Sequence, residues 1–172
     1  MPRQKVDHVQ LKRIKRQLPY LNKLFEEEDE NIKPEEKYKE CAICIFKDWL
    51  SEEDAHLVFT EDINEIKSRR KKFKSFIKSL FDTTDIFILD KLQSKRGSYI
   101  YKPSDLNYLM KMCEFDKLTE DRGKQYTLLI PEYSAIYQES YDWTNILYYR
   151  DLTKAEALIE LANKHGLHRI EF

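Results

Sequence analysis

Residues 125–150, QYTLLIPEYSAIYQESYDWTNILYYR, decide the fold. β-branched and aromatic residues dominate this stretch and strong helix formers are sparse, which is typical of strands. The pattern predicts two or three antiparallel strands, at 126–130, at 134–138 across the turn Pro131-Glu132-Tyr133, and at 145–149. Such a sheet is stable only when other elements cover a face, so we expect the rest of the chain to supply that cover.

The segments around this stretch are expected to alternate between helices and short strands. After it, Thr153 to Glu156 forms a capping box and Gly166 suits a helix C-terminus, with a short strand over 167–172. Before it, Thr60 is expected to cap a helix that runs to about Leu80. A strand at 86–89, a turn at 94–97 and a strand at 98–102 predict a hairpin, and Ser104 is expected to cap a further helix.

The first third of the chain is expected to be mainly helical. Residues 7–17 predict one helix, and Pro19 opens a second turn that leads into five consecutive acids at 26–30. From Pro34 to about Leu50, apolar residues alternate at spacings of three and four, which predicts a core helix. The short apolar run at 56–59 is interpreted as an extended connector or a brief strand.

These elements predict an α+β fold. A helical N-terminal half packs with a mostly antiparallel sheet of about five strands, followed by a C-terminal helix and a short final strand. We expect one domain over 1–172, with a helical N-terminal extension at 1–33, a helical part at 34–82 and a sheet-containing part at 83–172.

Composition and charge limit the classes of function. The chain has 172 residues, and its 30 basic and 31 acidic residues give a net charge of -1, so the overall charge does not indicate nucleic acid or a membrane as partner. The N-terminus lacks the apolar core of a signal peptide, and no apolar run approaches the roughly 18 residues of a spanning helix. Together with three cysteines, an odd number, these features predict a cytoplasmic protein.

No cofactor or metal site is predicted. Cys41 and Cys44 form a C-x-x-C pair inside the helix expected there, away from the helix N-terminus that a redox pair needs. A zinc site would need further ligands, and only Cys113 or His56 is at hand. The cysteines are therefore interpreted as packed thiols.

A metal-dependent hydrolase is the third alternative for function. Asp82, Asp85 and Asp90 flank the strand at 86–89, and Lys91 follows them. Asp82 and Asp85 are better explained as turn and strand-start residues, and Asp90 and Lys91 are expected to point to opposite faces of the strand.

The aromatic residues of the tyrosine-rich strands either pack in the core, if helices cover both faces of the sheet, or leave one face as a contact surface. Tyrosine and tryptophan are enriched in protein interfaces, and with flanking acids they suit an anchor cluster for a partner. The candidate partner-binding residues are Tyr137, Glu139, Tyr141, Asp142 and Trp143. The acidic run at 26–30 is a second candidate surface.

The strongest charge feature is the basic helix at 67–78. Lysine-rich helix faces are common where a helix is exposed to solvent, and they also bind phosphates. The candidate phosphate-contact residues are Lys67, Arg69, Arg70, Lys71, Lys72 and Lys74.

The sequence therefore favours a non-enzymatic protein that binds another macromolecule, with a protein as partner. High charge, many tyrosines and no catalytic motif are common in small bacterial immunity and antitoxin proteins, an analogy of size and composition only. The alternative is a nucleic-acid-associated protein that uses the basic helix.

Overall fold

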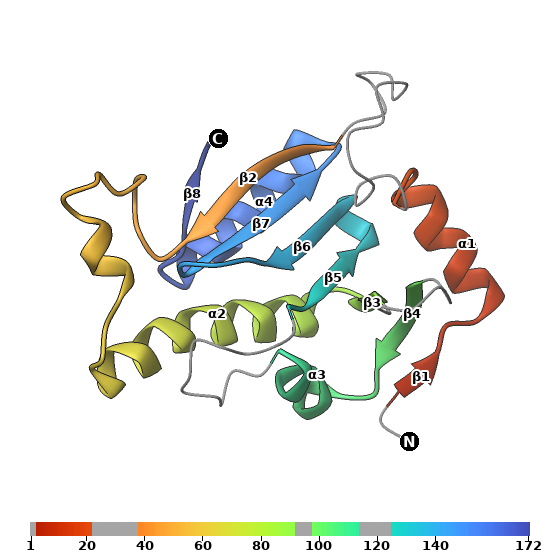
Figure 1. Ribbon diagram of the computed structural model, residues 1–172. Helices are drawn as coiled ribbons and strands as arrows, with labels where there is room; N and C mark the ends of the chain where they lie inside the picture. The colour runs from red at the N-terminus through yellow and green to blue at the C-terminus, as the bar shows by residue number, and fades with distance from the viewer. Residues whose placement is uncertain (1–2, 22–37, 92–97, 114–124) are drawn as a thin grey trace.

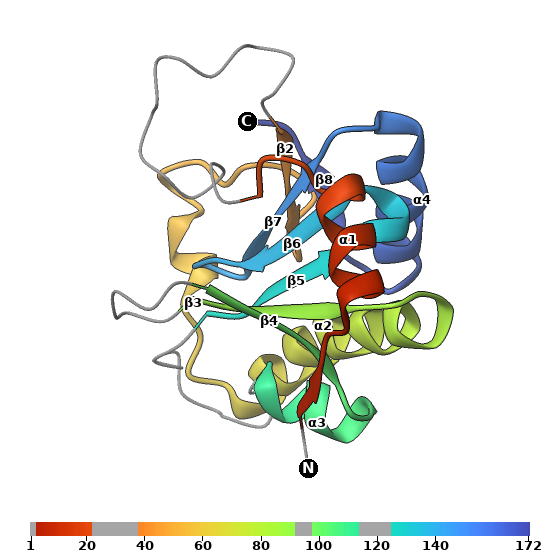
Figure 2. The ribbon, with the colours of Figure 1, turned by 90° about the vertical axis from the view of Figure 1, so that its right-hand side faces the viewer.

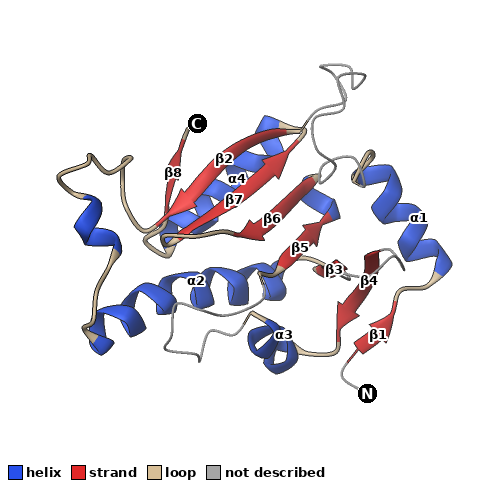
Figure 3. Ribbon diagram, in the orientation of Figure 1, coloured by secondary structure: helices blue, strands red, loops and turns tan. Residues whose placement is uncertain are grey.

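The structure, a computed structural model, describes residues 3–21, 38–91, 98–113 and 125–172. It is an α+β fold in which the described ranges form an eight-stranded antiparallel sheet and four α-helices (Figures 1 and 3). The strands are β1 (Arg3–Lys5), β2 (Lys39–Cys44), β3 (Phe87–Lys91), β4 (Ser98–Pro103), β5 (Thr127–Ile130), β6 (Ala135–Glu139), β7 (Thr144–Tyr149) and β8 (His168–Ile170). The helices are α1 (His8–Gln17), α2 (Ile63–Thr83), α3 (Leu106–Met112) and α4 (Leu152–Lys164), with short 3-10 helices η3 (Ala55–Val58) and η4 (Pro131–Tyr133).

The strand order is β1-β4-β3-β5-β6-β7-β2-β8, and helices pack on both faces of the sheet. On one face, side chains of α2, α3 and α4 share a core with β2 to β7; Phe76 of α2, for example, meets the ring of Tyr137 at 5.3 Å between centroids. On the other face, Ile14 and Leu18 at α1 pack against Phe87 and Ile136. Figure 2 shows α1 in front of the strands. The burial of these apolar faces is the main stabilising term of the fold.

The central meander follows the sequence pattern. β5, β6 and β7 are consecutive antiparallel neighbours, with Tyr137 opposite both Leu128 and Leu147. The turn between β5 and β6 contains η4, and Ser134 closes it with a left-handed φ of 50°. The three strands predicted from residues 126–149 are confirmed.

Residues 39–44 contradict the helix expected from Pro34 to Leu50. They form β2, which pairs with β7 on one side and β8 on the other. Cys41 and Ile43 enter the core under α2 and α4, whereas Ala42 and Cys44 are buried on the opposite face. A strand that is buried on both faces has no alternation of polar and apolar residues. Periodicity alone does not distinguish its apolar run from that of a buried helix.

Other boundaries also differ from the sequence prediction. Residues 55–58 form η3 and not a strand, and the helix caps are Asp62, Asp105 and Asp151 in place of Thr60, Ser104 and Thr153. Aspartate accepts the orphan amide hydrogens at a helix start as well as serine or threonine does. The eight strands exceed the expected number because β1 and β2 were not foreseen.

The remaining predictions for the described ranges hold at the level of element type. Helices α1, α2, α3 and α4 and the β3–β4 pairing are confirmed, and Gly166 has the left-handed φ of 75° expected after a helix C-terminus. The acidic run at 26–30 and the turn at 94–97 lie outside the described residues.

Candidate functional site

The turn between β6 and β7 has an unusual backbone. Asp142 and Trp143 have φ values of 57° and 58°, and the Thr144 amide donates to the Tyr141 carbonyl at 2.9 Å. Two consecutive left-handed residues define a type I′ turn, which matches the twist of a hairpin but is normally built with glycine or asparagine. Holding a tryptophan in this conformation costs on the order of 1 kcal/mol, which its contacts must offset.

Trp143 makes those contacts with the segment 45–62, which connects β2 to α2. Its indole Nε1 donates to the carbonyl of Val58 at 2.9 Å. The Arg69 guanidinium, from α2, donates to the same carbonyl at 3.2 Å and lies 5.4 Å from the Trp143 ring centroid. Phe46 lies 5.6 Å from the guanidinium, and Glu65 pairs with Arg69 at 2.8 Å. One arginine and one indole therefore fix the end of the segment against α2.

A second attachment holds the start of this segment. Trp49 Nε1 donates to the carbonyl of Glu171 at 2.7 Å, and the Trp49 and Phe172 rings lie 5.5 Å apart. The segment extends outward from the body of the molecule between these two attachments (Figure 1).

Large apolar side chains remain exposed on and beside the attached segment. Leu57 and Phe59 flank Val58, and Ile63 begins α2. Tyr141 is the first residue of the turn that contains Trp143. We call these four residues the end patch; their exposed fractions are 41% for Leu57, 67% for Phe59, 53% for Ile63 and 75% for Tyr141.

Acidic side chains surround the end patch. Between residues 48 and 62 the chain has no lysine or arginine. Its exposed acids are Asp48, Glu52, Glu53, Asp54, Glu61 and Asp62, and Asp142 is exposed in the turn. This end of the molecule therefore presents apolar groups within a negative field.

The five candidate partner-binding residues have different surroundings. Tyr141 and Asp142 are exposed, as an interface requires. Trp143 is half-buried and holds the 45–62 segment, while Tyr137 and Glu139 are buried in the sheet. Leu57, Phe59 and Ile63 were not predicted, because no local pattern marks them and their position beside Trp143 depends on the tertiary fold.

Tyr137 belongs to a buried polar network. The Asn145 side-chain amide donates to the Tyr137 hydroxyl at 2.7 Å and to the Tyr126 hydroxyl at 3.0 Å. Burial raises the pKa of Tyr137, an effect that the hydrogen bond from Asn145 partly opposes. The hydroxyl stays protonated at physiological pH. Its role is structural, since it accepts the hydrogen bond of the buried Asn145 amide.

The basic helix divides its cations between two environments. Arg69 and Arg70 are buried, and Lys72 is half-buried with its aliphatic chain near Gly166. Lys67, Lys71 and Lys74 are exposed, and Lys78 continues their row. We call the last four residues the lysine stripe. Their spacing of four, three and four residues places them within roughly 60° of arc and over about 16 Å of helix.

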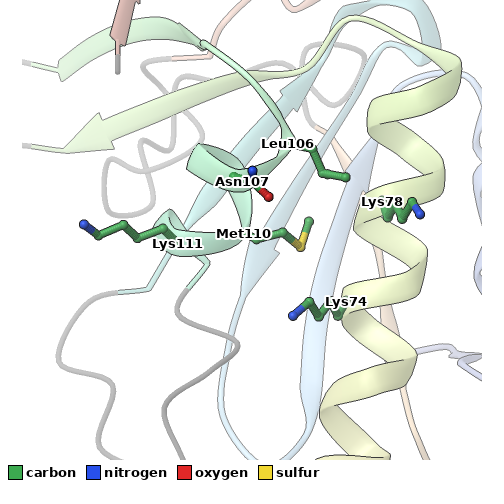
Figure 4. Close-up of a pocket in the computed structure, with 6 residues that line it drawn as sticks. All are labelled: Lys74, Lys78, Leu106, Asn107, Met110 and Lys111. Carbon is green, nitrogen blue, oxygen red and sulfur yellow. The ribbon is translucent and has the colours of Figure 1, made fainter. Parts of the chain in front are cut away.

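A groove of about 650 Å³ separates the lysine stripe from α3. It is lined by Lys74, Lys78, Leu106, Asn107, Met110 and Lys111. In Figure 4, Leu106 and Met110 point from α3 towards α2, Lys74 points towards α3, and Lys111 extends away on the outer side of α3.

The cysteines are packed thiols, as predicted, although the reason differs. All three are buried, and none forms a disulfide with another described residue. Cys41 and Cys44 are three residues apart on β2, so they point to opposite faces and cannot bond to each other. Burial raises the pKa of Cys41 to about 11, which leaves its thiol protonated and unreactive at neutral pH.

The three aspartates considered for a hydrolase are spread apart. Asp82 is exposed at the end of α2, and Asp90 is buried near the end of β3. Asp85 precedes β3 and makes ion pairs with Lys102 at 2.6 Å and Arg13 at 3.2 Å. Asp85 and Asp90 are five positions apart along an extended segment, which is about 16 Å at roughly 3.3 Å per residue and too far to share a metal ion. Within the described ranges, no group of three histidine, cysteine or acidic residues could hold a metal ion.

Comparison of the chain with protein-family models, with curated proteins and with solved structures found no match. None of the helices in the described ranges is both long and apolar enough to cross a membrane.

Proposed function

We propose that this protein acts by binding another protein through the end patch. The observation that carries the proposal is the exposure of Leu57, Phe59, Ile63 and Tyr141 beside a backbone that is held at both ends. Scattered single apolar residues are ordinary on a protein surface, but a group at one end is typical of an interaction site.

The attachments of the 45–62 segment favour tight binding. Association costs free energy when loops and side chains must become ordered. Here Trp143 and Arg69 fix Val58, so its neighbours Leu57 and Phe59 are positioned before any partner arrives. Left-handed backbone at a residue other than glycine is strained, and such strain is common at functional sites. The conformation of Trp143 is consistent with a role in holding the binding surface.

The charge around the end patch indicates the chemistry of the partner. The exposed acids at 48–62 and Asp142 complement a basic surface with an apolar recess. Proteins that cleave nucleic acids present basic surfaces of this kind. Within this proposal, the protein is an immunity- or antitoxin-like inhibitor that acts in the cytoplasm and covers the basic active site of a toxin.

Substitution within the end patch tests the binding site. Phe59→Ser should weaken binding to the partner at least fivefold, because central aromatic residues supply more than about 1 kcal/mol each in interfaces. The matched control is Val9→Ser, since Val9 is 76% exposed on α1, away from the end patch. The measurement is calorimetric titration with the product of the neighbouring gene, or with a protein captured by the wild-type chain. Equal affinities of the Phe59 and Val9 variants for the partner would exclude the end patch.

A charge test addresses the inhibitor proposal. Changing Glu52, Glu53 and Asp54 to lysine should slow association and reduce its salt dependence, with a smaller effect on dissociation. In cells that express the partner, the same variant should protect growth less than the wild type does. Unchanged growth with and without the protein would contradict inhibition, even if the two proteins bind.

A further inference from the structure

The lysine stripe of α2 begins one helical turn after Ile63 of the end patch and has a different chemistry. Its four cations occupy one exposed face over about 16 Å. Glu65, which pairs with Arg69, stands before the stripe, and Asp82 follows it. No acidic residue lies on the helix between these two positions, so the four lysines follow one another without an acid of α2 among them.

The groove beside the stripe adds a second kind of contact. Leu106 and Met110 offer apolar surface, and the exposed Asn107 offers an amide that can donate and accept hydrogen bonds (Figure 4). The nearest acid of α3, Asp105, caps the helix by accepting from the Tyr108 amide at 2.8 Å and from the Ser104 hydroxyl at 2.8 Å. This combination suits a nucleotide: its base or sugar would contact the apolar surface and the amide, and its phosphate would lie on the lysines.

We propose that the lysine stripe and the α2–α3 groove bind a single strand of nucleic acid through its sugar–phosphate backbone. The buried arginines, Arg69 and Arg70, take no part, and Lys78 joins Lys67, Lys71 and Lys74. A single strand can lay phosphates along the stripe and direct a base towards Leu106 and Met110. A duplex keeps its bases stacked inside, so it would use the stripe alone.

The salt dependence of binding to a labelled single-stranded oligothymidylate, measured by fluorescence anisotropy, tests the proposal. Four lysine–phosphate contacts predict a log–log slope of about −3, and a loss of affinity of about 50-fold between roughly 50 and 200 mM salt. Each Lys→Gln change in the stripe should reduce the slope by about 0.7. The matched controls are Lys12→Gln and Lys15→Gln, because both lysines are exposed on α1, on the other face of the sheet.

The groove needs its own variant. Asn107→Asp places a negative charge in the groove without touching the stripe, and it should weaken binding of the single strand more than binding of a duplex of the same length. Thermal unfolding of each variant shows that the fold is retained.

Three outcomes would overturn the proposal. One is equal loss of affinity in the α1 controls and the stripe variants, which would indicate diffuse charge attraction. Another is the absence of binding at about 50 mM salt, where electrostatic binding is strong. The third is binding of a nucleoside triphosphate as tight as that of the oligonucleotide, which would indicate a small-anion site.

Discussion

Tyr137 shows how one residue can look like an interface residue in the sequence and be a core residue in the fold. Its ring is fully buried against Phe76, and its hydroxyl accepts from Asn145. A buried hydroxyl without a partner costs about 1–3 kcal/mol, so the core can contain this tyrosine only if it also contains a donor. Asn145 supplies that donor.

The network predicts a large effect of Asn145→Ala on stability. The change removes the donor to the buried Tyr137 hydroxyl, and we expect a loss of about 2–3 kcal/mol in the free energy of unfolding. Urea denaturation measures this loss. Asn107→Ala, at an exposed position of α3, should change stability by less than about 0.5 kcal/mol.

A double-mutant cycle with Tyr137→Phe separates the hydrogen bond from the packing. Once the hydroxyl is gone, Asn145→Ala should cost about 1 kcal/mol less than it does in the wild type. Strict additivity of the two changes would mean that the hydrogen bond at 2.7 Å contributes nothing to stability.

At the scale of elements, α2 joins the core and both candidate surfaces. Phe73, Phe76, Ile77 and Leu80 face the sheet, Arg69 turns to the 45–62 segment, and the lysine stripe faces solvent. A helix of 21 residues has enough turns to present all three faces. The periodicity of its apolar residues was visible in the sequence, whereas the division of its cations was not.

Trp143 supplies one of the contacts that attach the 45–62 segment at Val58. Trp143→Ala removes the hydrogen bond to Val58 and one ring next to Arg69, so we expect a loss of about 1–3 kcal/mol in stability. Amide hydrogen exchange in residues 55–59 should also become faster. Tyr141→Ala, in the same turn but 75% exposed, should leave both measurements nearly unchanged. Unaltered exchange in Trp143→Ala would show that the segment is held by other contacts.

At the scale of the whole molecule, Asp85 connects elements that are distant in sequence. Its carboxylate pairs with Lys102 of β4 and with Arg13 of α1. The hydrogen bond from Lys102 is the largest effect on the pKa of Asp85 and lowers it. Burial opposes this effect, and the charges of Lys102 and Arg13 lower the pKa further. The three side chains are about one third exposed, so solvent screening limits their contribution to about 1 kcal/mol or less.

The lowered pKa predicts a loss of stability in acid. The contribution of Asp85 is fully present above its unfolded pKa of about 4 and is lost as the pH falls through the lower folded value. The wild type should therefore be more stable than Asp85→Asn near neutral pH, and the difference should shrink below about pH 4. Urea denaturation over this pH range measures it. Lys102→Met should show a similar reduction in pH dependence, and a constant difference between wild type and Asp85→Asn would contradict the assignment.

The sequence determined the elements whose residues carry a clear local pattern. The meander at 127–149 has β-branched and aromatic residues with tight turns, and α2 and α4 have helical apolar spacing with an aspartate at each start. These signals are local because backbone preferences, caps and turns depend on neighbouring residues. The exposure of Tyr141 and Asp142 could be predicted in the same way, because a turn is a local feature and turns lie on the surface.

Only the tertiary structure decided the rest. β2 is a strand because β7 and β8 flank it and both its faces are buried, which residues 39–44 do not reveal by themselves. β1 is short and polar, and it exists because the edge of β4 offers it hydrogen-bonding partners. The end patch and the α2–α3 groove each combine residues far apart in the chain. Burial and proximity depend on the packing of all elements together, and a linear pattern does not contain that information.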